Sequence, residues 1–175
     1  MPEGHSRRTA RLALAALAAV AFLPLAAAGS WPGGGAAVER TPPRALVAAA
    51  AGRAAAKLRR PECRELLSDF RDAAGRRLAE VLEERRAGAP EYLSRLIFVD
   101  GRNVPRCAGG DVAAGAFPGS PYIAVCKETF ARVQAEDPGL AANTLIHEML
   151  HALGLGEDPP TSEEITRQVA KRCGR

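Results

Sequence analysis

Four cysteines constrain the fold of this chain more than any other feature. They stand at Cys63, Cys107, Cys126 and Cys173, separated by 44, 19 and 47 positions. A metal site built on cysteines normally uses closely spaced pairs, so this spacing favours two disulfides in an oxidising compartment. Cys63 and Cys173 each lie on the apolar stripe of an expected helix. We therefore predict the pairs Cys63–Cys173 and Cys107–Cys126.

The N-terminal segment predicts the compartment that these disulfides need. Three arginines within the first eleven residues precede an apolar stretch at 12–28, which ends in Ala26-Ala27-Ala28. Such a pattern is typical of a cleaved signal peptide, here 1–28. The stretch is shorter than the roughly 20 apolar residues of a membrane span. We expect a secreted or periplasmic protein with no stable membrane insertion after cleavage.

Composition indicates one globular domain after a linker. Residues 29–43 are rich in Gly and Pro and predict a flexible linker. The chain is 47% hydrophobic, which is enough for a core, so 44–175 is expected to form one domain. The net charge is +4, and the charges alternate in sign without a concentrated basic face. Nucleic acid is therefore not an expected partner.

Hydrophobic periodicity and end signals predict a small, mostly helical α+β domain. Asp137 followed by Pro138 begins a helix that Gly154 ends, and Thr161 with Glu164 forms a capping box for the last helix. A short β element of two or three strands is expected beside the helix that Gly154 ends. The expected helices span 44–59, 61–87, 128–136, 137–153 and 161–172, and the expected strands span 95–101 and 122–126.

The helix at 137–153 carries the chemistry. It contains His147-Glu148-Met149-Leu150-His151, and four residues advance a helix by slightly more than one turn. Both imidazoles therefore project from one face, where two nitrogens can bind one zinc ion. Glu148 is placed to take a proton from water without itself binding the metal. His147 and His151 are the only histidines that remain once residues 1–28 are cleaved.

The segment Leu145-Ile146-His147-Glu148-Met149-Leu150-His151-Ala152-Leu153-Gly154 resembles the active-site helix of the zincin metallopeptidases. The resemblance implies that His147 and His151 bind Zn²⁺ and that Glu148 is the general base. It also implies a zincin-like domain with a mixed sheet beside this helix, whose edge strand binds an extended substrate. We take the strand at 121–126 as the counterpart of that edge strand.

The third metal ligand follows from a narrower resemblance. In metzincins a Gly stands three residues after the second His and a third ligand three residues later. Gly154 and Glu157 occupy these positions, with Glu in place of the usual His or Asp and with no following Met turn. Carboxylate oxygen is an accepted third ligand of catalytic zinc, so we predict Glu157. The alternatives are Asp158, Glu163 and Glu164, of which Glu164 already has a role in the capping box.

Two classes of function fit this sequence. The first is an exported zinc-dependent metallopeptidase acting on a peptide or protein substrate, and a zinc hydrolase acting on another amide is related to it. The second is a non-catalytic exported protein that keeps the helix for zinc binding or for stability. Glu148 favours the enzyme, because a purely structural site needs no base there. Tyr122 is a lesser candidate for oxyanion stabilisation. The sequence does not predict the oligomeric state.

Overall fold

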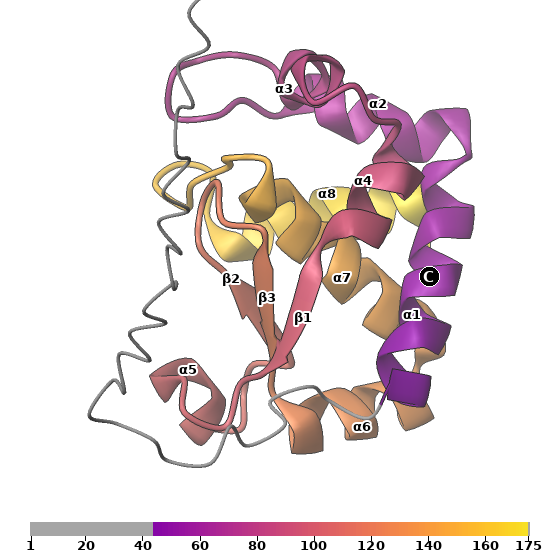
Figure 1. Cartoon of the computed structure of the whole chain (residues 1–175), viewed down its shortest axis with the longest axis vertical. Coiled ribbons are helices and arrows are strands. Elements are labelled where there is room, and N and C mark those ends of the chain that lie inside the picture. The colour runs from indigo at the N-terminus through magenta and orange to yellow at the C-terminus, as the bar shows by residue number, and fades with distance from the viewer. Residues whose placement is uncertain (1–43, 175) are drawn as a thin grey trace, which may run out of the picture. The chain divides into compact units, whose positions relative to one another are not determined.

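The computed structural model describes residues 44–174, and the predicted signal peptide and linker lie outside this range. The described chain is an α+β domain, as expected from the sequence (Figure 1). Its elements are α1 (Arg44–Leu58), α2 (Pro61–Asp69), α3 (Leu78–Glu84), α4 (Ala89–Arg95), β1 (Ile97–Asp100), α5 (Pro105–Ala108), β2 (Ala114–Ala116), β3 (Tyr122–Val125), α6 (Lys127–Glu136), α7 (Pro138–Ala152) and α8 (Ser162–Cys173).

The expected single helix at 61–87 is wrong, because a turn divides it into α2 and α3. The carboxylate of Asp72 accepts hydrogen bonds from the backbone N–H groups of Ala74 and Arg76, both at 2.9 Å. Gly75 takes a φ of +79° in the same turn. An Asp side chain that binds nearby backbone groups competes with the helix, and it prevails here over the apolar periodicity.

The three strands form one sheet in the order β1-β3-β2. β1 is parallel to β3, and β2 is antiparallel to it. β3 is therefore the central strand, and the expectation that the strand at 121–126 is the edge strand beside the site helix is wrong. That edge belongs to β2, a segment of sequence Ala-Gly-Ala that lacks the β-branched residues by which strands are predicted.

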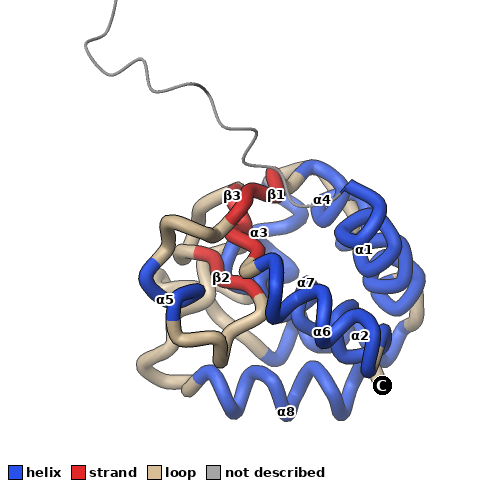
Figure 2. The backbone as a smooth tube through the Cα atoms, turned by 90° about the horizontal axis from the view of Figure 1, so that it is seen from below, coloured by secondary structure: helices blue, strands red, loops and turns tan. Residues whose placement is uncertain are grey.

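Helix α7 is the centre of the core and carries the candidate site. It packs against α1, α6 and α8 and against β2 (Figures 1 and 2). A helix that is apolar nearly all round is buried, and seven of its residues have no exposed surface. These are Ala141, Ala142, Leu145, Ile146, Met149, Leu150 and Ala152. The side chain of Asp137 accepts the N–H of Leu140 at 2.9 Å, which confirms the predicted helix start.

A hydrogen bond from α4 holds the C-terminal end of α7. The Tyr92 hydroxyl of α4 donates to the carbonyl oxygen of Ala152 at 2.9 Å, within the buried interior. The last carbonyl groups of a helix have no partner inside the helix, so this bond satisfies one of them. Gly154 follows with a φ of +114°, in the region that favours glycine and that the sequence predicted for this helix end.

Both predicted disulfides are confirmed. Cys63–Cys173 joins α2 to the end of α8, and Cys107–Cys126 joins α5 to the residue after β3. Two disulfides favour an oxidising, extracytoplasmic environment. Within residues 44–174 no helix combines the length and the apolar character needed to cross a membrane.

Candidate metal centre

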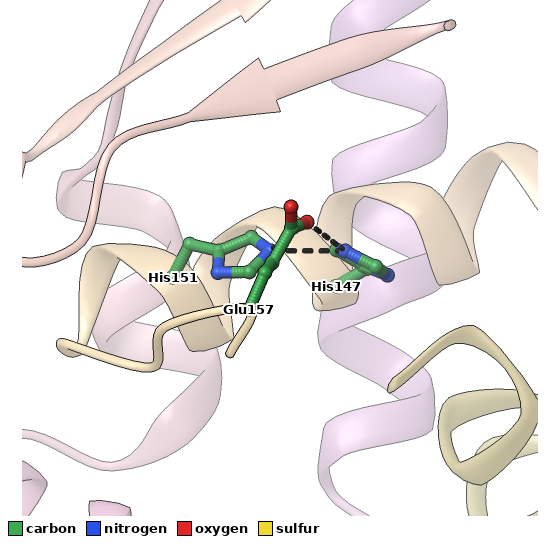
Figure 3. A group of neighbouring side chains, drawn as sticks. All are labelled: His147, His151 and Glu157. Atoms are coloured by element: carbon green, nitrogen blue, oxygen red, sulfur yellow. Dashed lines mark hydrogen bonds and ion pairs between the residues drawn. The ribbon is translucent and has the colours of Figure 1, made fainter. Parts of the chain in front are cut away.

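His147 and His151 lie on the same face of α7, one turn apart. Their Nε2 atoms are 3.0 Å from each other, and both side chains are buried. Figure 3 shows the two tilted rings with their nitrogen edges directed at each other and the carboxylate of Glu157 extending towards both. The four-residue spacing thus brings the imidazoles together as the sequence predicted.

Glu157 reaches this pair from the turn that follows α7. Its Oε1 atom is 3.2 Å from His151 Nε2 and 3.9 Å from His147 Nε2. One ligand atom from each of the three residues lies within 4.8 Å of the others, a grouping that could hold a metal ion. The turn is compact because the N–H of Leu155 donates to the carbonyl oxygen of Leu150 at 3.1 Å.

The other carboxylates considered as third ligands are not part of this group. Glu163 is exposed and pairs with Arg167 at 2.7 Å. Glu164 accepts the N–H of Thr161 at 2.9 Å in the predicted capping box. Asp158 is exposed beside Glu157. Of these four acidic residues, the structure brings only Glu157 to the two histidines.

Each histidine ring also has a hydrogen-bond partner at Nδ1, on the side away from the centre. His151 Nδ1 lies 2.8 Å from the carbonyl oxygen of Leu155. A carbonyl can only accept, so Nδ1 carries the proton and Nε2 presents a lone pair. His147 Nδ1 lies 3.1 Å from the hydroxyl of Thr166 on α8, which can accept from Nδ1 or donate to it. Such outer partners orient the histidine ligands of metal sites.

The charges of the centre also suit a cation. Burial, aided by the neighbouring His151, lowers the pKa of His147 to about 4, so its imidazole is neutral at pH 7. Burial alone would raise the pKa of Glu157, but hydrogen bonds from Arg106 and Ser162 outweigh it and hold that pKa below its usual value. Glu157 is therefore a carboxylate at pH 7. Neutral imidazole and ionised carboxylate are the forms that bind metals.

The distances agree with a shared ion. Ligand atoms bound tetrahedrally at about 2 Å from one zinc lie about 3.3 Å apart. The Nε2–Nε2 distance of 3.0 Å and the Nε2–Oε1 distance of 3.2 Å at His151 are slightly shorter than this value. The Nε2–Oε1 distance of 3.9 Å at His147 is longer. At 3.0 Å the two Nε2 atoms can share a hydrogen bond when one of them is protonated, or direct both lone pairs at one cation. Two His with one Glu is a donor set that catalytic zinc sites use.

Glu148 lies beside this group but is not one of the three residues in it. Its side chain is buried, and burial raises its pKa to about 7, while a hydrogen bond from the N–H of Ala116 on β2 opposes part of that rise. The nearby charge of Glu157 raises the pKa further. A carboxyl group with a pKa near 7 can both accept and release a proton at neutral pH.

A pocket of about 310 Å³ opens onto the group. His147, Glu148 and Glu157 line one part of it, and apolar side chains that include Val133, Leu140 and Val169 line another. Pockets that bind small molecules or peptide side chains begin at about this size. Tyr122, the lesser candidate for oxyanion stabilisation, is not among the lining residues, and its side chain is 52% exposed on β3.

Several residues that contact the centre were not predicted from the sequence. They include Arg106, Thr166 and Ala116, which contact Glu157, His147 and Glu148 respectively. Each contact joins segments that the fold alone brings together. The position of Thr166, five residues after the capping-box threonine on the same helix, is the only local signal that could have placed one of them near the turn that carries Glu157.

Comparisons of the chain with protein-family models, with curated proteins and with solved structures found no match.

Proposed function

We propose that this chain is an exported, zinc-dependent metallopeptidase that hydrolyses peptide bonds with Glu148 as its general base. The observation that carries the proposal is the convergence of His147, His151 and Glu157, with the buried carboxyl group of Glu148 lining the same pocket as His147 and Glu157. His147 and His151 would bind zinc through Nε2, and Glu157 through Oε1.

A zinc ion at this position would supply a Lewis acid that polarises a carbonyl oxygen and lowers the pKa of water to about 7. The chain's own contribution to the proton transfers is Glu148. Burial raises its pKa to about 7 in the metal-free protein, where it can exchange a proton near neutral pH. A carboxylate oxygen of Glu148 would take a proton from water in the pocket and later pass it to the leaving amine.

The buried carboxyl group favours an enzyme over a protein that merely stores or is stabilised by zinc. Moving a carboxyl group out of water costs free energy unless it is well paired, and Glu148 has one backbone donor as its partner. A structural site gains nothing from that cost. A catalytic site gains a base with the required pKa.

Strand β2 supports a peptide as the substrate. The carbonyl oxygen of Ala113 accepts the N–H of Cys126 at 3.0 Å, whereas the N–H of Ala116 points to Glu148. Alternate residues of a strand direct their backbone groups to opposite edges, so the N–H and C=O of Ala114 also point away from β3. Ala114 lines the pocket with 2% of its surface exposed, and this edge of β2 is where the backbone of an extended chain would bind.

Export is the second part of the proposal. The two disulfides favour an extracytoplasmic environment, and the segment 1–28 has the arginines and the apolar stretch of a signal peptide. Sequencing the N-terminus of the protein from the producing cell's exterior would test this part, with a new N-terminus near residue 29 expected.

The enzyme is tested by zinc content and peptide cleavage measured on the same samples of the full chain. Wild type is expected to hold about one zinc per chain and to cleave members of a mixed peptide panel. Glu148→Gln keeps the shape of the side chain but cannot accept the proton, so cleavage should fall by about 10²–10⁴-fold with zinc retained. Glu163→Gln removes an exposed carboxylate on α8 and should keep both properties. Zinc binding without cleavage in wild type would support the non-catalytic alternative.

A further inference from the structure

Arg106 is the only Lys or Arg among the residues that line the pocket. Its Nη2 atom lies 3.3 Å from Oε2 of Glu157, across 51 positions of sequence. The other oxygen of the same carboxylate, Oε1, is the one that faces the two histidines. The two oxygens of Glu157 therefore have separate partners, and the contact to Arg106 leaves Oε1 directed at the imidazoles.

The backbone that carries Arg106 is held to the sheet at several points. The neighbouring Cys107 is bonded to Cys126 at the end of β3. Gly101 packs so closely on this bridge that a Cβ there would come 2.5 Å from Cys107 Sγ. The hydroxyl of Thr129 on α6 donates to the carbonyl oxygen of Gly110 at 3.1 Å. These contacts hold the segment from 101 to 110 in place on both sides of Arg106.

Glu157 needs such support more than the histidines do. Both histidine side chains are buried on a rigid helix, whereas the Glu157 side chain is 30% exposed on a turn. A partly exposed Glu has several rotamers open to it, and only some of them direct a carboxylate oxygen to the histidine pair. A partner that binds one oxygen restricts this choice.

We propose that Arg106 is a positioning residue that orients Glu157 for metal binding, and that the Cys107–Cys126 disulfide holds Arg106 in that place. This inference rests on the metal site of the proposed function. It assigns to the short disulfide a role in metal affinity that is separate from its contribution to stability.

The direction in which zinc affinity changes when Arg106 is replaced separates a positioning role from a purely electrostatic one. A positive guanidinium close to a metal ion repels that ion, so removing its charge alone would tighten binding. Removing a residue that orients a ligand weakens binding, by about 10–100-fold for outer partners in known metal sites. The two explanations therefore predict opposite changes for the same variant.

The test is a zinc titration of the metal-free full chain against a competing chelator. Arg106→Met has a similar length and no donor, and it should weaken zinc affinity tenfold or more. Arg106→Lys keeps the charge and should lie between Arg106→Met and wild type. Arg167→Met is the matched control, since Arg167 is also 61% exposed and paired with a surface glutamate. It should change affinity less than twofold.

The outcomes distinguish this inference from the function on which it rests. Zinc binding by wild type with equal or tighter binding by Arg106→Met overturns the positioning role and leaves the metal site intact. Absence of zinc binding by wild type overturns both.

The role of the bridge is tested by combining variants. Cys107→Ala/Cys126→Ala should weaken zinc affinity, and adding Arg106→Met should weaken it little further, because both changes act on the same contact. If the fold-losses in zinc affinity from the two changes multiply in the combined variant, the role of the bridge is overturned. Circular dichroism and denaturant unfolding of the metal-free samples show whether each variant folds. Should the double variant not fold, Gly101→Ala displaces the same bridge, and an unchanged zinc affinity in that variant would overturn the role as well.

Discussion

The carbonyl oxygen of Leu155 accepts a hydrogen bond from Nδ1 of His151 at 2.8 Å, and Leu155 belongs to the turn that carries Glu157 to the site. The same turn therefore determines the tautomer of one candidate ligand and the position of another. Gly154 makes this turn possible, with a φ of +114° and with the Cβ of Asp72 only 3.1 Å from where its own Cβ would be. The metal centre depends on the backbone of this turn as much as on its side chains.

Gly154→Ala is expected to destabilise the protein and to weaken zinc binding. A side chain at this φ costs about 1–3 kcal/mol, and relief of the strain would move both the Leu155 carbonyl and Glu157. Denaturant unfolding and zinc titration measure the two effects. Gly156→Ala is the matched control in the same turn, since its φ is not in the left-handed region and nothing lies within 4 Å of the added Cβ. Equal behaviour of the two variants would contradict the role given to Gly154.

The pKa of Glu148 predicts a pH dependence of stability for the metal-free protein. Burial raises this pKa from 4.5 to about 7, so between these values the folded state binds more protons than the unfolded state. Stability due to this group is therefore present below pH 4.5 and falls as the pH rises to about 7, by roughly 3 kcal/mol. The side chain in Glu148→Gln stays neutral, so this variant does not lose that stability as the pH rises.

The measurement is the free energy of unfolding in chelator at pH 4.5 and pH 7, for wild type and Glu148→Gln. All other titrating groups are common to both proteins, so the difference between them reports on Glu148. The variant should gain stability relative to wild type as the pH rises. A difference that stays constant with pH would show that Glu148 is not held in a buried environment.

The disulfide that closes the longer loop should contribute more to stability. The chain-entropy model gives about 5 kcal/mol for the separation of 110 residues and about 3 kcal/mol for that of 19. Cys63→Ala/Cys173→Ala should thus lower the melting temperature more than Cys107→Ala/Cys126→Ala. It should also lower zinc retention, because Cys173 anchors α8, which supplies Thr166 to His147. A non-reducing peptide map that links Cys63 to Cys107 or Cys126 would contradict the pairing.

The parts of the site that lie close in sequence could be predicted, because local geometry determines them. His147 and His151 share a face through helical spacing alone, and Glu157 follows the helix within six residues of His151. The disulfide pairing was predictable for a related reason. Cys63 and Cys173 both lie on apolar helix stripes, so burial brought them together.

The parts that were missed depend on contacts between distant segments or on very short elements. Arg106 contacts Glu157 across 51 positions of sequence, from a helix that the Cys107–Cys126 bridge ties to the residue after β3. Strand β2 has three residues and no β-branched side chain, so its pairing with β3 decides its structure. The break between α2 and α3 depends on the side chain of Asp72, whose turn overrides an apolar periodicity that continues through both helices.

The zinc affinity of Glu157→Ala tests the central claim most directly, because the claim is that the turn after α7 completes a three-residue metal site. Zinc titration of the metal-free full chain is the measurement, with Asp158→Ala and Glu163→Ala as matched removals of nearby carboxylates. We predict that Glu157→Ala weakens zinc binding tenfold or more and that the two controls change it little. Loss of zinc in Glu163→Ala with normal binding in Glu157→Ala would contradict the account and place the third ligand on α8.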